Sequence, residues 1–171
     1  MNFFFPSSDK GKTFFGIAAV LMNPQSRGTV TLATSNPNDP PVCDPKFLSH
    51  PFDKVNALAM ARKIMDLIES PAIKENTIAA AVYPKSDSDE DIWETIMESI
   101  SSTWHMSGTC KMGTQDDDLA VVDNKFKVKG IEGLRVVDLS VLPLEPNCHT
   151  VSWAYLTGWT GAETLIKEYG Y

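Results

Sequence analysis

Three stretches of this sequence carry apolar residues at helical spacing: 53–70, 88–101 and 150–167. The first is followed by Pro71, which marks its end, and the second begins with a serine and three carboxylates that suit a helix N-terminus. The third contains several alanines and glycines, which allow a helix to approach a sheet or a ligand closely. The pattern therefore predicts three helices, and the second leads directly to His105.

Strands are predicted where the sequence has a short apolar run or alternates apolar with polar residues. Residues 13–22 form an apolar run, residues 28–33 alternate threonine with valine and leucine, and the turn residues 23–26 between them predict an antiparallel hairpin. A proline-rich surface loop is expected at 35–41. Residues 125–129 alternate lysine with apolar residues, and 134–137 are an apolar run that ends at Asp138, so each predicts a further short strand.

These elements predict an α+β fold, with an antiparallel sheet covered by helices and a small C-terminal portion of strand and helix. The character of the sequence changes near residue 101, which divides a sheet-and-helix part, residues 1–100, from a motif-rich part, residues 101–171. A chain of 171 residues with 43% hydrophobic residues can bury a sizeable core. We expect the two parts to form one compact unit.

Charge and cysteine usage exclude several classes of function. The formal net charge is -7, and the lysines and arginines are scattered, which argues against binding to nucleic acid or to an anionic membrane. Three cysteines are too few for a disulfide framework and favour a reducing compartment. Residues 1–6 lack the basic leader of a signal peptide, so we expect a cytoplasmic protein without a membrane span.

Two histidines stand in the most distinctive settings, His105 within WHMSGTCKMG (104–113) and His149 within PNCHTVSW (146–153). Imidazole suits proton transfer near neutral pH, so the two are predicted to form one site. A zinc site made with Cys110 and Cys148 is not expected, because neither spacing is a standard one for metal ligands. His50, between a serine and a proline, is predicted to be a loop or helix-entry residue.

Five segments together resemble the C-terminal part of the glucose-methanol-choline (GMC) oxidoreductases. They are SRGTVTL (26–32), DPKFLSHPFD (44–53), HMSGTCKMG (105–113), LRVVDLSVLP (134–143) and the segment around His149. Their order and spacing cover nearly the whole chain. The resemblance implies a flavoenzyme that oxidises an alcohol, or acts on an alcohol-type or polyketide-like small molecule.

The resemblance also implies roles for individual residues. His105 corresponds to the catalytic base, and His149 to the position that hydrogen-bonds the substrate oxygen. Asp138 and Thr150 fall in segments that lie against FAD, so they would bind this cofactor if it is present. The neighbouring Trp104, Asn147 and Trp153 are candidates for contact with the substrate. No metal is expected.

The dinucleotide fingerprint G-x-G-x-x-G of such flavoenzymes does not occur in this sequence. We therefore expect weak or no FAD binding by this chain alone, and surfaces that a homo-oligomer or a separate chain with the FAD domain would cover. Three function classes stay open: part of an FAD-dependent alcohol oxidoreductase, an FAD-independent isomerase, dehydratase or cyclase, and a non-catalytic binding domain. The chain begins with Met1 and ends soon after its last predicted helix, which favours the second class over the first.

Overall fold

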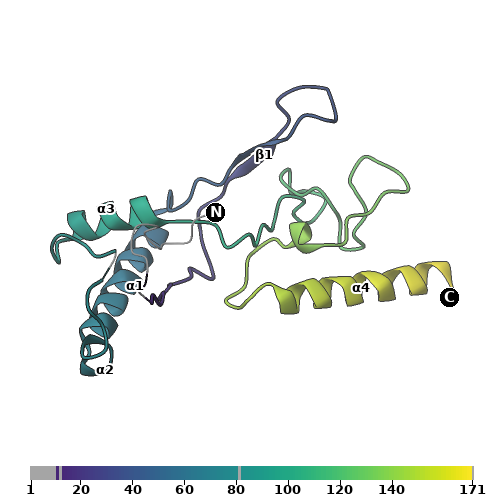
Figure 1. Ribbon diagram of the computed structural model, residues 1–171. Coiled ribbons are helices and arrows are strands. Elements are labelled where there is room, and N and C mark those ends of the chain that lie inside the picture. Colours follow the sequence, from purple (N-terminus) through teal and green to yellow (C-terminus); the bar gives the residue numbers. More distant parts are fainter. Residues whose placement is uncertain (1–10, 12, 81, 171) are drawn as a thin grey trace. The chain divides into compact units, whose positions relative to one another are not determined.

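A computed structural model describes residues 11, 13–80 and 82–170 of the chain (Figure 1). The N-terminal residues 1–6, considered above for a leader, lie outside the described residues. The chain divides into two compact units, one joining the described residues up to Leu21 with Leu48–Ser102, the other joining Met22–Phe47 with the chain from Thr103 onward. The last stretch of the first unit ends at Ser102, and residues 22–47 belong to the second unit.

The first unit is built from helices α1 (Pro51–Glu69), α2 (Pro71–Lys74) and α3 (Asp89–Ser99). The predicted helix entry at His50 is confirmed, since its ring Nδ1 accepts a hydrogen bond from the backbone N–H of Phe52 at 3.2 Å and caps α1. Helix α1 packs against α3, and Ile92 of α3 is fully buried. The guanidinium of Arg62 also bonds the Asp89 carboxylate, at 2.6 Å.

The predicted start of α3 is confirmed as well. The hydroxyl of Ser88 accepts a hydrogen bond from the Asp91 backbone N–H at 3.2 Å, and the three acidic residues occupy the first turn. Negative charge is stabilised there by the free amides of the helix end. The acidic run therefore has a structural role in this unit.

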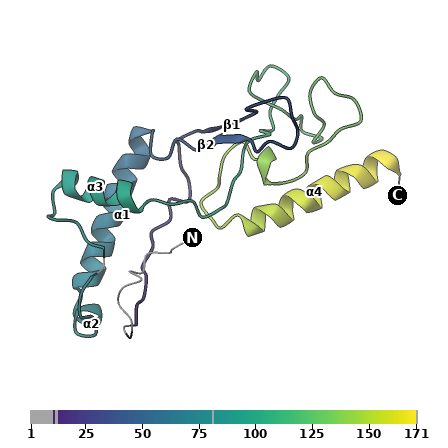
Figure 2. The same cartoon turned by 45° about the horizontal axis from the view of Figure 1, so that its top comes forward.

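The sheet of the second unit has two antiparallel strands, β1 (Thr29–Thr31) and β2 (Val42–Asp44), with Val30 opposite Cys43 (Figure 2). The α+β class is confirmed, but the predicted hairpin partner was wrong, because residues 13–22 form no strand. The proline-rich loop 35–41 instead connects the two strands, and its turn is closed by a bond from the Asp39 N–H to the Asn36 carbonyl at 3.1 Å. A three-residue strand is too short for its apolar pattern to identify.

The strands predicted at 125–129 and 134–137 are also corrected. They form isolated bridges, Val122 with Val128 and Lys127 with Arg135, in place of a continuous ladder. The cause is the backbone at Phe126, whose φ of 65° leaves the extended region. Phe126 is nevertheless buried with Val122 and Val141, so the apolar positions of the pattern do lie in a core.

The predicted last helix is confirmed as α4 (Val151–Tyr169), which contacts the 3-10 turn η1 (Leu139–Val141). A Cβ at Gly161 would overlap the Val137 side chain, so the small residue permits a close approach. Much of α4 is apolar and exposed, with Tyr155 79% and Trp159 69% accessible. No helix in the described part of the chain is long and apolar enough to cross a membrane.

Candidate active site

Backbone hydrogen bonds fix the segment that follows His105. The N–H groups of Gly108, Cys110 and Met112 donate to the carbonyls of Leu139, Ser140 and Val141, at 3.2, 2.8 and 2.8 Å. The two segments therefore run side by side, although some thirty residues separate them in the sequence. Beyond Val141 the chain passes through the loop 142–150, which carries His149 back to the same place.

This course of the chain brings the two histidines together. The centroids of the His105 and His149 rings are 5.9 Å apart, and the ring planes make an angle of 73°, an edge-to-face arrangement. Both residues are exposed. Two imidazoles that face solvent at this separation can reach one small molecule from two sides.

The backbone next to His105 adopts unusual conformations. Trp104 has a φ of 58°, in the left-handed region that costs a residue with a Cβ about 1 kcal/mol or more. Gly108 has a φ of 77°, and a Cβ there would lie 3.2 Å from the Leu142 carbonyl oxygen. Strained backbone of this kind clusters at functional sites, where the surrounding structure holds it in place.

The loop before α4 positions the other substrate-contact candidates. The Cys148 N–H donates to the Pro146 carbonyl at 2.7 Å, a tight turn, and the indole N–H of Trp153 donates to the Cys148 sulfur at 3.0 Å. Trp153 is half-buried, whereas Asn147 and Trp104 are exposed. The thiol of Cys148 thus accepts a hydrogen bond that ties the loop to the first turn of α4.

Glu145 is a titratable residue that the sequence-based prediction of the site did not include. Burial raises the pKa of the Glu145 carboxyl, while the positive charges of His105 and Arg27 act in the opposite direction. Glu145 lies in the loop that carries His149 and is half-buried. Its signal in the sequence is weak, a single carboxylate among leucines and prolines, and Arg27 stood out only as part of a family segment.

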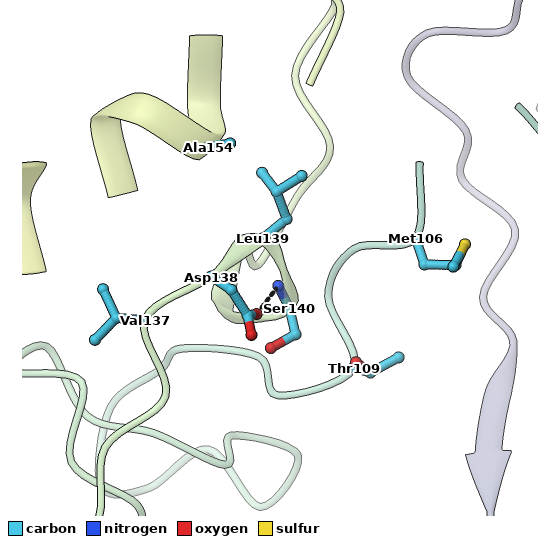
Figure 3. A pocket seen from close by; sticks show the side chains of 7 residues that line it. All are labelled: Met106, Thr109, Val137, Asp138, Leu139, Ser140 and Ala154. Carbon is cyan, nitrogen blue, oxygen red and sulfur yellow. Dashed lines mark hydrogen bonds between the residues drawn. The ribbon is translucent and has the colours of Figure 1, made fainter. Parts of the chain in front are cut away.

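A hollow of about 500 Å³ lies beside the segment that carries His105 (Figure 3). Met106 and Thr109 line one side of it, and Asp138 and its neighbours in η1 line another. The Asp138 carboxylate accepts a hydrogen bond from the Ser140 N–H at 2.7 Å and caps η1. Asp138 thus has a structural role and stays exposed at the same time.

Thr150, the second candidate for cofactor contact, is only 5% exposed and begins α4. Its side chain makes no capping hydrogen bond. The N–H groups of the first turn can therefore donate to an acceptor on a ligand. Ala154, at the end of that turn, lines the hollow shared with Asp138.

The first-turn N–H groups of α4 suit a ligand that carries hydrogen-bond acceptors, such as the carbonyl oxygens and ring nitrogens of a flavin. The ADP half of FAD finds no counterpart, because the sequence has no glycine-rich dinucleotide fingerprint. Within the described residues, no three side chains of His, Cys, Asp or Glu come close enough together to hold a metal ion.

Comparison with known proteins identifies the chain's relatives. Residues 24–158 match the family model described as GMC oxidoreductase. The dehydrogenase pkfF of Emericella nidulans is 42% identical over 95% of this chain, and the versicolorin B synthase of Aspergillus parasiticus is 39% identical over 82%. The chain spans only about a quarter of each relative, 26% and 22% of their lengths.

Solved structures give the same result. A fungal aryl-alcohol oxidase matches 88% of this chain at 35% identity with a TM-score of 0.70, and an FAD-dependent oxidoreductase from Chaetomium thermophilum matches 86% at 27% identity with a TM-score of 0.72. The matched parts are 25% and 26% of those chains. The family model covers well over half of the sequence. The chain therefore belongs to the GMC oxidoreductase family.

Proposed function

We propose that this chain supplies the acid/base residues of a GMC-type active site. The site acts on a small organic molecule that is alcohol-type or polyketide-like. The observation that carries the proposal is the placement of His105 and His149, whose ring centroids lie 5.9 Å apart on an exposed surface. A substrate hydroxyl can approach both rings at once. Relatives with dehydrogenase and synthase names support an enzymatic role.

The two histidines have different roles in this proposal. His105 accepts the hydroxyl proton of the substrate on an imidazole nitrogen, as a general base. His149 donates a hydrogen bond to the same oxygen and orients it. Trp104, Asn147 and Trp153 surround the pair along the chain and contact the rest of the substrate. The fixed backbone at Gly108 holds the base in place.

FAD is the proposed cofactor of the complete site. Asp138, Thr150 and the first-turn amides of α4 would hold its ring end. When bound, the flavin would supply the hydride acceptor for oxidation of an alcohol to a carbonyl compound, and His105 would take the hydroxyl proton. A nucleotide-binding fold is needed for the rest of the cofactor, on a separate chain or segment, and that fold or a second copy of this chain would cover the apolar face of α4.

A second candidate is FAD-independent acid/base catalysis, as an isomerase, dehydratase or cyclase. One observation favours keeping it: a relative is named versicolorin B synthase, whereas others are named dehydrogenase or oxidoreductase. In this version the same two histidines move protons between positions of one substrate. No electrons leave the molecule.

Binding of anisyl alcohol and anisaldehyde to the purified chain, followed by NMR at the imidazole rings, tests the shared site. We expect the ring signals of His105 and His149 to move together as the probe is added, and those of His50 to stay unchanged. His105→Gln should abolish the response at His149. If neither ring responds to either probe in the folded chain, the proposed site is wrong.

Added FAD distinguishes the candidate functions. Under anaerobic conditions, bleaching of flavin absorbance by anisyl alcohol that disappears in His105→Gln supports alcohol oxidation. Conversion of a hydroxylated aromatic polyketide without flavin, lost in the same variant, supports the second candidate. Probe binding with no conversion in either assay would leave a binding domain, the third class considered from the sequence.

A further inference from the structure

Helix α4 carries an apolar stripe on the side opposite the one with which it packs. Its inward side holds the buried Thr157 and Gly161, and Gly161 lies against Val137. The outward side presents apolar side chains that are about half exposed or more: Val151, Tyr155, Trp159, Ile166 and Tyr169. A helix that is apolar on both sides is normally covered on both sides.

The stripe is large enough to form a protein interface. Tyr155, Trp159 and Tyr169 are 79, 69 and 58% exposed. Because an aromatic side chain carries about 150–250 Å², these three rings expose roughly 400 Å². An exposed apolar patch of this size usually marks a site of interaction. It is also about half of the ~800 Å² that each partner contributes to a standard interface.

Two neighbouring rows of side chains give the stripe its shape. Residues four apart lie along one row of a helix surface. The small row holds Ala154, Gly158 and Ala162, and the ring row beside it holds Tyr155 and Trp159. All five residues are exposed, and the first two members of each row line a hollow of about 380 Å³. The ring row therefore forms a ridge, and the small row forms a groove next to it.

A ridge beside a groove is complementary to itself. If two copies of α4 cross with their N-termini on the same side, the ring row of each copy faces the small row of the other. Packing between rows of this kind gives a crossing angle of about −50°, and small residues allow the axes to approach to about 8 Å. Charge does not oppose the contact, because Glu163 and Lys167 at the border of the stripe form an ion pair with each other at 3.7 Å.

We propose that this chain forms a parallel dimer with twofold symmetry through the outward stripe of α4. The ring row of each copy packs on the small row of the other. A second copy is the partner that fits, because a twofold contact uses the same surface on both subunits and this stripe supplies both halves of it. The contact uses neither histidine of the candidate site, so the inference goes beyond the proposed function.

Sedimentation equilibrium of the purified chain tests the dimer over a roughly hundredfold range of concentration. The wild type should approach twice the mass of one chain as the concentration rises. Gly158→Gln should raise the Kd of the dimer by at least about tenfold, because the longer side chain fills the groove. Gly158→Ala adds only a side chain of the size already present at residues 154 and 162, and should leave the dimer intact.

The fold of Gly158→Gln should not suffer. Nothing lies within 4 Å of a Cβ added at Gly158, and glutamine favours a helix more than glycine does. Circular dichroism should therefore show the helix content of the wild type, with a thermal midpoint that is no lower at a concentration where both chains are monomeric. These measurements separate a lost contact from a damaged helix.

Thr160→Gln is the matched control for the groove. Residue 160 is exposed and lies about 200° around the helix from residue 158, away from the stripe. The same side chain introduced there should leave the Kd of the dimer unchanged. Trp159→Ser removes a ring from the ridge and should weaken the dimer as Gly158→Gln does, again with unchanged helix content.

Each outcome decides the inference. A chain that stays monomeric over the whole range of concentration overturns it, and leaves the stripe for a chain with a nucleotide-binding fold. A dimer that is equally strong in Gly158→Gln and Trp159→Ser also overturns it, because another surface then joins the copies. Neither measurement uses substrate or FAD, so failure of the dimer is distinguishable from failure of the proposed function.

Discussion

Residues 108–141 and the two histidine segments at their edge differ in burial and in backbone hydrogen bonding. The first region has a core of Val122, Phe126 and Val141 and a dense set of backbone hydrogen bonds, although it contains almost no regular strand. The histidine segments are exposed and include a left-handed tryptophan. Residues 108–141 contribute to the stability of the fold, and they hold the histidine segments in place.

The difference teaches how a chain with little regular structure can position a site. The bonds from Gly108, Cys110 and Met112 to η1 fix the base of both segments, so only a few residues separate each histidine from rigid structure. Binding and catalytic residues are often carried by loops on a rigid scaffold. Substitutions in the two regions should therefore have separable effects, on stability in one and on chemistry in the other.

The largest expected effect is at His105. His105→Gln should lower the turnover of the FAD-supplied chain by roughly a hundredfold to ten-thousandfold, because a general base contributes about that much. Its unfolding free energy should change by less than about 0.5 kcal/mol, since the side chain is exposed. Steady-state kinetics and urea unfolding measure the two quantities. A stability loss equal to that of a core variant would break the comparison.

A core variant should lose stability and keep its activity. Val122 is fully buried, so Val122→Ala leaves a cavity and should cost about 2 kcal/mol of unfolding free energy. Urea unfolding followed by circular dichroism gives the value. At a temperature where the variant is folded, its kcat/KM should stay within about threefold of the wild type. A loss of a hundredfold there would mean that the core and the site are not separable.

Substitutions at two glycines of α4 distinguish the packed side of this helix from its exposed side. Gly161→Ala should lower stability by roughly 1–3 kcal/mol, because its Cβ would overlap Val137. Gly158→Ala is the matched control, with no atom within 4 Å of the added Cβ, and should raise stability by about 1 kcal/mol through helix propensity. Thermal unfolding of the pair measures both. Equal effects would show that α4 does not pack on Val137 as described.

The smallest effect concerns the ion pairs at the end of α4. Hydrogen bonds from Lys127 and Arg135 lower the pKa of Glu168 below its ordinary value of 4.5. A lowered carboxyl pKa stabilises the folded state above pH 4.5, and the contribution disappears as the pH falls through the lowered value. Glu168→Gln should therefore be slightly less stable than the wild type at pH 7 and equal to it in strong acid. Urea midpoints across that range check the sign.

The helices were predictable because each has a local signal. Ser88 and its acidic followers mark the start of α3, and Pro71 follows Ser70, the residue that ends α1. The sheet was not predictable, since β1 pairs with the three-residue β2 and not with the longer apolar run 13–22. The left-handed Phe126 likewise breaks a strand that its alternating neighbours predict. Pairing and backbone reversal depend on contacts that a local pattern does not contain.

Part of the candidate site was also readable from the sequence. His105 and His149 stood out through their motifs, and the structure places their rings near each other. Glu145 was missed, because a single carboxylate among leucines and prolines does not lie in a pattern typical of a site. Its partial burial depends on the folded loop.

A double-mutant cycle on His105 and His149 tests the central claim most directly. kcat/KM for anisyl alcohol is measured with FAD supplied for the wild type, His105→Gln, His149→Asn and the double variant. Two residues acting on one substrate oxygen are strongly non-additive, so the double variant should be little slower than His105→Gln alone. Losses that multiply independently would contradict a shared site.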